Sequence, residues 1–382
     1  MAARNDDSLL FVVEWFDPLP MMKKQYLLKL FTDQHMVEMV DLKSRKMFLR
    51  KSPCPNELTK DDFYVGSKIC LYSRELEIID YGDLKTKERL FMHVQQCVVI
   101  LPSCSYNDWG KTIQKLNHNM VLTKVKTIIM SQSTADRVCG ILNIGQRKNS
   151  EFSSGVSLVV QLQGSDGFNK VEDVVANSGK SGADVDYILY MVHTYIYILR
   201  YYILTHTGIY TGGGPIYSTT NNIQSVELQE LLFNNNTIST ATYDSCTCVI
   251  VKPHSIKSGD FGAILEHITR QGYEVSAAQS MQFERAQAEE FLKVYKGVIP
   301  DFADHVTQLC LGISVALEVR AENAVRTFRE TAGPWDIEMA KELRPDTIRG
   351  QYGLDRSRSA VHCTDLPQDG LPECEYCFKI MQ

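Results

Sequence analysis

The sequence has no excess of positive charge, which weighs against nucleic acid as a partner. Its 40 lysine and arginine residues are outnumbered by 46 aspartate and glutamate residues, and the formal net charge is −6. Domains that bind nucleic acid usually carry a basic patch or an overall basic balance. The remaining composition, 44% hydrophobic and 23% charged residues, is ordinary for a soluble globular protein.

The sequence also lacks an apolar run long enough to cross a bilayer. The most apolar stretch, 185–204, has only 13 residues between Asp186 and Arg200, and His193 and Thr194 interrupt them. A transmembrane helix needs about 20 apolar residues. We therefore expect this tyrosine-rich stretch to be a buried helix, or one docked on a partner protein, and we expect no membrane partner.

Disulfides are not expected, although the chain has 11 cysteines. Residues 1–8 show no apolar run after a basic region, so no secretory signal is expected. Free thiols in a reducing compartment such as the cytoplasm fit better. Two pairs are closely spaced, Cys246-x-Cys248 and Cys374-x-x-Cys377, but neither is followed by a second pair at zinc-ribbon spacing. Structural thiols are favoured over a metal site, and no metal ligand is assigned.

The length and the local patterns predict three domains of α+β character. A chain of 382 residues is too long for one ordinary core. Residues 1–90 contain short β-prone segments between polar turns, spaced near ten residues apart, which is typical of a small barrel or sandwich. Residues 91–240 and 241–382 carry mixed helix and strand patterns.

The pattern of the third domain is βαββαβ, the ferredoxin-like arrangement. Alternating or continuous apolar runs indicate its strands, and 3.6-residue periodicity indicates its helices. The expected strands are 246–252, 273–283, 313–319 and 374–380, and the two main helices are 261–271 and 323–331.

One histidine stands out by its neighbours. His362 is followed by Thr364 and Asp365, and Glu373 comes eleven residues later. Imidazole is a good nucleophile near neutral pH because its ordinary pKa is about 6.5. A carboxylate can hold the ring in one orientation and favour its charged, phosphorylated form. The set therefore predicts phosphohistidine chemistry.

Three separated motifs resemble nucleoside diphosphate kinases over about 245–382. Cys248-Val-Ile-Val-Lys-Pro-His254 resembles the family's first strand with its Lys-Pro ending. Arg344-Pro-Asp-Thr-Ile-Arg-Gly350 resembles its Pro-x-Thr-Ile-Arg-Gly helix start, and Val361-His-Cys-Thr-Asp365 its His-Gly-Ser-Asp motif. The resemblance implies that His362 accepts the γ-phosphate of Mg²⁺-ATP and passes it to a nucleoside diphosphate.

The resemblance also implies a role for the surrounding residues. Lys252 would contact the γ-phosphate, and Glu373 would orient His362, with Thr364 in place of the family serine. The remaining nucleotide-binding positions would be two phosphate-binding arginines, a tyrosine near the histidine, a base-stacking phenylalanine and its apolar neighbour: Arg329, Arg349, Tyr295, Phe302 and Val306. From residue type alone, each arginine could instead form a surface ion pair, and each aromatic or apolar residue could simply pack in the core.

Three departures from the family pattern affect this site. Ser359 replaces the asparagine that binds the sugar, and Trp335 falls near the threonine that contacts phosphate. Cys363 replaces the glycine after the histidine and adds a side chain where the backbone is tight. The site is therefore expected to be slow in catalysis or to bind nucleotide only.

The middle domain resembles a decayed copy of the same kinase. Residues 96–102 resemble the first strand, with Leu101 where the lysine belongs, and 154–162 resemble 311–319. The nucleophile position falls at Tyr217, so the copy would lack electrostatic stabilisation of phosphate. Ser178-Gly-Lys-Ser181 looks like the end of a P-loop, but the preceding glycine is replaced by Val174, and a polar turn is favoured.

Residues 1–90 resemble the DM-ten module, a pleckstrin-homology-like barrel. The resembling segments are 14–17, 37–41, 48–49, 71–74 and 79–83. This module precedes two kinase domains in ciliary members of the family, and tandem copies occur in proteins that line ciliary microtubules. The resemblance implies a structural component of doublet microtubules, located in cytoplasm, cytoskeleton and axoneme. Its partners would be tubulin, other axonemal proteins and nucleoside di- and triphosphates; an active nucleoside diphosphate kinase is the alternative.

Overall fold

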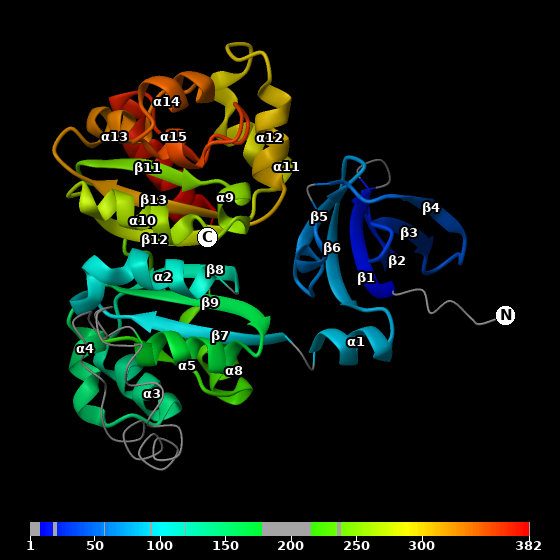
Figure 1. The fold of residues 1–382 in the computed structure, drawn as a ribbon, viewed down its shortest axis with the longest axis horizontal. Coiled ribbons are helices and arrows are strands. Elements are labelled where there is room, and N and C mark those ends of the chain that lie inside the picture. Colours follow the sequence, from blue (N-terminus) through cyan, green and yellow to red (C-terminus); the bar gives the residue numbers. More distant parts are fainter. Residues whose placement is uncertain are drawn as a thin grey trace, which may run out of the picture.

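Two antiparallel sheets organise the chain in the computed structural model, which describes residues 8–17, 21–56, 58–91, 94–118, 120–177, 215–234 and 238–381 (Figure 1). The tyrosine-rich stretch 185–204 and Ser178–Ser181 lie outside the described residues, so the expectations for them stay predictions. Within the described parts of the chain, no helix combines the length and apolarity needed to cross a bilayer.

The first sheet accounts for the β-rich pattern of 1–90. Its six strands run in the order β4-β3-β2-β1-β6-β5. Along β1, Leu9, Phe11 and Val13 are buried while the residues between them are partly exposed, as expected for a strand with one face on a core. The strands are β1 (Ser8–Asp17), β2 (Met22–Phe31), β3 (Met36–Asp41), β4 (Met47–Pro53), β5 (Lys68–Leu71) and β6 (Arg74–Tyr81), followed by α1 (Leu84–Phe91).

The second sheet has eight strands and consists of two halves. Each half has its strands in the order 4-1-3-2, which is the ferredoxin-like arrangement: β10-β7-β9-β8 and, reversed, β12-β13-β11-β14. The strands of the first half are β7 (Val94–Leu101), β8 (Val121–Ile128), β9 (Ser157–Ser165) and β10 (Tyr217–Ser218). Those of the second half are β11 (Cys246–Val251), β12 (Glu274–Met281), β13 (Ser314–Arg320) and β14 (Val361–Cys363).

The two halves share one hydrophobic core on one face of this sheet. Helical side chains in it come from α2 (Trp109–Asn117), α5 (Gly167–Asn177), α10 (Phe261–Arg270) and α13 (Ala324–Ala332), and from Ile256 and Ile348 on two shorter helices. The other face is covered separately in each half, by α3 (Gln132–Leu142), α4 (Asn149–Ser153) and α8 (Asn222–Leu232) in the first, and by α11 (Arg285–Phe291), α12 (Phe302–Cys310) and α16 (Gly370–Glu375) in the second. The shared core makes the two halves one packing unit.

The strand register corrects the expected position of the lysine in the first half. Leu101 pairs with Leu158 on β9, and Val251 pairs with Val315 on β13. Since the β9 and β13 sequences align, Leu101 corresponds to Val251. The counterpart of Lys252 is therefore the proline that follows Leu101, and the assignment of Leu101 itself was wrong by one residue.

The same register places Tyr217 where the second half has its histidine. Tyr217 lies opposite Ile100, and His362 lies opposite Ile250, the matching position of β11. The Tyr217 hydroxyl donates to a carboxylate oxygen of Glu151 at 2.6 Å. The phenol of Tyr217 therefore occupies the position that His362 has in the second half, but it has no imidazole nitrogen that could act as a nucleophile.

The expected last strand, 374–380, is wrong. These residues form the end of α16 and a π-helix, Tyr376–Ile380, while the fourth strand of the half is β14. Cys374, Cys377 and Phe378 are all buried, and their spacing of three and four residues is the helical period. Packing against the back of β11 therefore favours a helix here, although the short apolar segment resembles a strand.

Helices α2 and α10 cross at a glycine contact that joins the halves (Figure 1). A Cβ at Gly262 would lie 2.7 Å from the carbonyl oxygen of Gly110, and closer still to the backbone nitrogen of Gln114. Backbone atoms cannot yield as a flexible side chain can, so this crossing requires glycine.

We predict that Gly262→Ala lowers the free energy of unfolding by about 1–3 kcal/mol through overpacking. Alanine would otherwise stabilise a helix by up to about 1 kcal/mol relative to glycine. Gly140→Ala is the matched control, because it also lies in a helix, α3, and a Cβ there meets nothing within 4 Å. Urea unfolding of both variants checks the sign, and a Gly262→Ala protein as stable as the control would contradict the close crossing.

Candidate functional site

His362 lies on β14, at the edge of the second sheet, and is only 2% exposed. Its Nε2 lies 2.9 Å from Oε2 of Glu373 on α16, and the Thr364 hydroxyl donates to the same oxygen at 2.8 Å. Nδ1 is buried and has no hydrogen-bond partner among the described residues. The carboxylate therefore fixes the tautomer with hydrogen on Nε2 and leaves the Nδ1 lone pair available.

Two aromatic rings and one backbone amide hold this arrangement. Phe291 and Tyr295 meet the imidazole edge-on, with ring centroids 5.0 and 6.2 Å away. The backbone nitrogen of Cys248 on β11 donates to the Thr364 hydroxyl oxygen at 3.1 Å. The histidine is thus oriented by the strand pairing as well as by Glu373.

Lys252 follows the end of β11 and points into the protein, where it is 4% exposed. Its Nζ donates to the Ser359 hydroxyl at 2.8 Å and to the Ser357 carbonyl at 2.9 Å. Burial, and then the nearby charge of Arg349, lower the pKa of Lys252 to about 7. Ser359 is itself fully buried, so its hydroxyl serves the lysine and has no exposed surface for a sugar.

The two expected phosphate-binding arginines differ in their surroundings. Arg349, in the first turn of α15 (Ile348–Tyr352), is 4% exposed and donates to the carbonyls of Gly333 and Val361 at 2.9 and 3.3 Å. Arg329 on α13 is half-exposed and pairs with Asp365, its Nε lying 3.4 Å from the carboxylate. Arg349 is therefore a buried cation, and Arg329 lies at the rim.

Trp335 covers the two buried cations. The centre of its ring lies 5.8 Å from Nζ of Lys252 and 5.2 Å from the guanidinium carbon of Arg349, within reach of cation–π attraction. The indole stacks on Tyr295 and on His305, with centroids 5.8 and 5.3 Å away. Because an indole lies near the position expected for the threonine, the cations face an aromatic ring.

The structure brings five expected site residues together and leaves others at the margin. His362, Glu373, Thr364, Lys252 and Arg349 converge around β11 and β14. The other expected positions differ. Tyr295 borders the histidine, and Arg329 lies at the rim. Phe302 is half-buried against the core that contains the fully buried Val306.

Two residues make contacts at the site that were not predicted from the sequence. Asp365 accepts a 2.7 Å hydrogen bond from the Tyr295 hydroxyl and also pairs with Arg329, and its place at the end of the histidine motif was the available signal. His305 stacks on Trp335 at the site, and no motif in the sequence singled it out. Burial, and then Lys252, lower the pKa of His305 to about 4, so its ring is neutral.

Comparisons with known proteins bear on the whole chain. Residues 245–382 match the family model described as Nucleoside diphosphate kinase. The mouse protein named Nucleoside diphosphate kinase homolog 7 is 31% identical over 100% of this chain and 95% of its own length. The chain belongs to the nucleoside diphosphate kinase family. The rat protein of the same name is 30% identical to this family member, with the same coverage.

Shorter relatives match about a third of the chain. The Nucleoside diphosphate kinase of Aquifex aeolicus is 33% identical over 35% of this family member and 91% of its own length. A crystal structure of the Aquifex aeolicus kinase covers 35% of this chain and 93% of its own, with a TM-score of 0.33.

We predict that Lys252→Met flattens the dependence of stability on pH. The pKa of about 7 in the folded chain lies below the ordinary 10.5, so between these values the unfolded chain binds more protons at Lys252 than the folded chain. Stability should therefore rise by about 1 kcal/mol per pH unit between about pH 7 and pH 10, and this contribution should be constant below pH 7. The methionine variant has no such group.

Urea unfolding at a series of pH values measures the difference. Lys115→Met, at an exposed position of α2, is the control and should keep the wild-type slope. If the unfolding free energies of wild type and Lys252→Met had equal slopes against pH, burial would not lower the pKa of Lys252 in the folded chain.

Proposed function

We propose that this chain is a structural component of ciliary doublet microtubules, a microtubule inner protein built on nucleoside diphosphate kinase-like domains. The observation that carries the proposal is the covering of the phosphate site: the Trp335 ring lies over both Lys252 and Arg349. The same indole stacks on Tyr295 and His305. Because it lies against both cations, we expect phosphate to bind weakly there, which favours a scaffold over a fast enzyme.

The middle part of the chain supports the same proposal. Tyr217 has the register of His362, and a proline follows Leu101 where the second half has Lys252. We interpret 91–240 as a degenerate kinase-like domain retained for packing. Its contribution to the shared core explains why it would persist without chemistry.

The first sheet supports a docking role, and we interpret 1–90 as a DM-ten module. Figure 1 shows it beside the second half of the kinase-like unit, and polar contacts join the two. Nζ of Lys257 lies 2.7 Å from Asp62, Nζ of Lys68 lies 3.3 Å from Glu284, and Gln282 donates to the Lys68 carbonyl at 3.1 Å. We expect tubulin and other axonemal proteins as partners of this joined surface.

Active nucleoside diphosphate kinase is the second candidate, and the geometry of His362 favours it. Nδ1 would attack the γ-phosphorus of bound Mg²⁺-ATP, the bond to the ADP oxygen would break, and phosphohistidine would then transfer the group to a nucleoside diphosphate. Glu373 would stabilise the positive ring that forms. Lys252, Arg329 and Arg349 would neutralise charge on the phosphates.

We predict that Trp335→Thr increases acid-labile phosphate on the chain after treatment with labelled ATP by about tenfold or more. A tenfold change corresponds to about 1.4 kcal/mol, the scale of one lost cation–π contact. The control, Trp335→Thr combined with His362→Gln, should carry no such phosphate. Labelling that survives the loss of His362 would exclude this histidine as the acceptor.

We predict that incorporation into axonemes does not need His362. A tagged His362→Ala protein should remain on salt-washed doublet microtubules at the wild-type level, because docking uses surfaces away from the site. Deletion of 1–90 should reduce incorporation. A wild-type protein spread through the cytosol and absent from the doublets would contradict the structural role and favour the enzyme.

A further inference from the structure

Four cysteines of the second half lie in one buried cluster, two on β11 and two in 374–377. β11 is the strand that pairs with β14, which carries His362. Cys246 and Cys248 project from the same face of β11, since alternate residues of a strand share a face. Cys374 and Cys377 lie one helical turn apart on α16 and the π-helix that follows it, which pack on that face. All four are free thiols with little or no exposure.

The sulfur atoms lie at distances suited to a shared ion. The Cys374 thiol interacts electrostatically with the thiols of both Cys246 and Cys248. Sulfur atoms of Cys246 and Cys374 and a carboxylate oxygen of Glu318 all lie within 4.8 Å of one another. In a tetrahedral zinc thiolate site, Zn–S bonds of about 2.3 Å separate the sulfurs by about 3.8 Å. Small side-chain rotations would therefore close the set around an ion.

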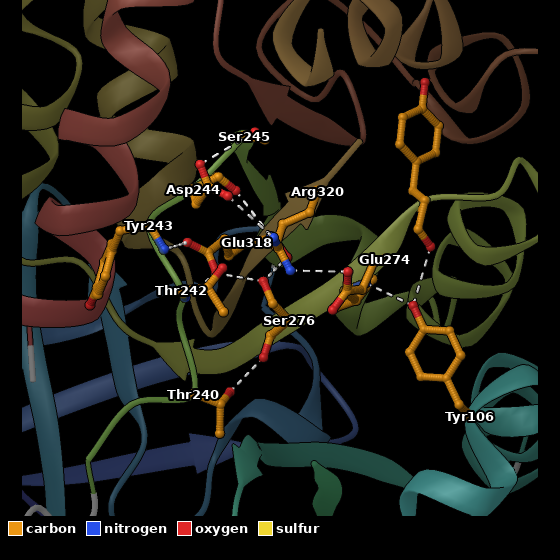
Figure 2. Close-up of polar contacts among 12 residues, drawn as sticks. Tyr106, Thr240, Thr242, Tyr243, Asp244, Ser245, Glu274, Ser276, Glu318 and Arg320 are labelled. Atoms are coloured by element: carbon orange, nitrogen blue, oxygen red, sulfur yellow. Dashed lines mark hydrogen bonds and ion pairs between the residues drawn. The ribbon is translucent and has the colours of Figure 1, made fainter. Parts of the chain in front are cut away.

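Glu318 adds an uncompensated charge to this set. It lies on β13 with no exposed surface, and its carboxylate accepts hydrogen bonds from the backbone nitrogens of Thr242 and Tyr243, both at 2.7 Å, and from the Ser276 hydroxyl (Figure 2). Within the described residues, these donors are neutral and no lysine, arginine or histidine forms an ion pair with it.

The nearest arginine along the strand is engaged elsewhere. Arg320 pairs with Asp244 at 3.5 Å and with Glu274 at 3.1 Å (Figure 2). A buried carboxylate without a cation is costly, because burial removes the water that stabilises its charge. A metal ion at the thiols would supply the missing positive charge.

We propose that Cys246, Cys248, Cys374 and Glu318 form a zinc site. Zn²⁺ is usually four-coordinate and binds thiolate and carboxylate ligands. Its binding would release the protons of the three thiols to solvent. The hydrogen bonds from Thr242, Tyr243 and Ser276 orient the Glu318 carboxylate. Metal ligands in proteins are commonly oriented by such hydrogen bonds from neighbouring groups.

Cys377 is assigned as a neighbour of the site and not as a ligand. The Cys374 thiol interacts with Cys246 and Cys248, whereas the sulfur of Cys377 contacts that of Cys248 at 3.7 Å. Cys248 is therefore the nearer candidate to complete the set of Cys246, Cys374 and Glu318. The linear spacing of the two cysteine pairs gave no sign of the site, because β11 and α16 meet only in the folded domain. Since Glu373 precedes Cys374 on α16, the ion would also hold the carboxylate that orients His362.

The test is a cobalt and zinc titration of the full-length chain, purified reduced and free of metal. One equivalent of Co²⁺ should produce the visible bands and the thiolate charge-transfer band of a tetrahedral thiolate site, and one equivalent of Zn²⁺ should remove them. Cys374→Ser should abolish the bands, and Glu318→Gln should lower zinc affinity by about tenfold or more. Cys377→Ser, one helical turn away, is the matched control and should keep both bands and stoichiometry.

Thermal unfolding gives a second readout that is independent of nucleotide chemistry. Zinc should raise the Tm of wild type and of Cys377→Ser but not of Cys374→Ser; Cys246→Ser replaces the last if it does not fold. Wild type without stoichiometric metal binding, or metal retained by Cys374→Ser, would overturn the site. If Cys377→Ser lost the metal, the proposed set of ligands would be wrong. If two of the thiols formed a disulfide and the chain bound no metal, the assignment of a zinc site would be wrong as well.

Discussion

The antiparallel pairing of β11 with β13 and β14 is the constraint on which the rest of the site depends. It sets His362 opposite Ile250, and it places Lys252 at the buried end of the same strand. It also turns Cys246 and Cys248 toward α16, the helix that carries Glu373. A shift of one residue in this pairing would exchange the two faces of β11, and the histidine, the lysine and the thiols would all lose their partners together.

The same sheet shows how a family fold can keep its architecture while its chemistry changes. The two halves have the same strand order and meet in one core across the α2–α10 crossing. In the first half, Tyr217 donates its hydroxyl to Glu151 where the second half has His362 bound to Glu373. In the second half, the Trp335 ring lies against Lys252 and Arg349, the cations proposed to bind phosphate. Packing constrains the whole sheet, whereas the chemistry depends on a few side chains.

Features that depend on residues close together in the sequence could be predicted, whereas features that depend on packing between distant segments could not. The βαββαβ order and the contact of Glu373 with His362 followed from short patterns, because the strand and the following helix are close in sequence. Residues 374–380 were expected as a strand, since a short apolar run does not reveal whether a strand or a helix will cover β11. The contacts of Trp335 with Lys252 and Arg349 and the meeting of the cysteines depend on segments far apart in the chain, so linear spacing did not reveal them.

The most direct test of a structural role is a cryo-electron microscopy map of doublet microtubules from cells that express this chain. The account predicts density inside the doublet that fits the six-stranded and eight-stranded sheets, with the Trp335 indole over Lys252 and Arg349 and no nucleotide between them. A doublet lumen without this density, or a chain there with nucleotide bound beside His362 and Trp335 displaced, would contradict it.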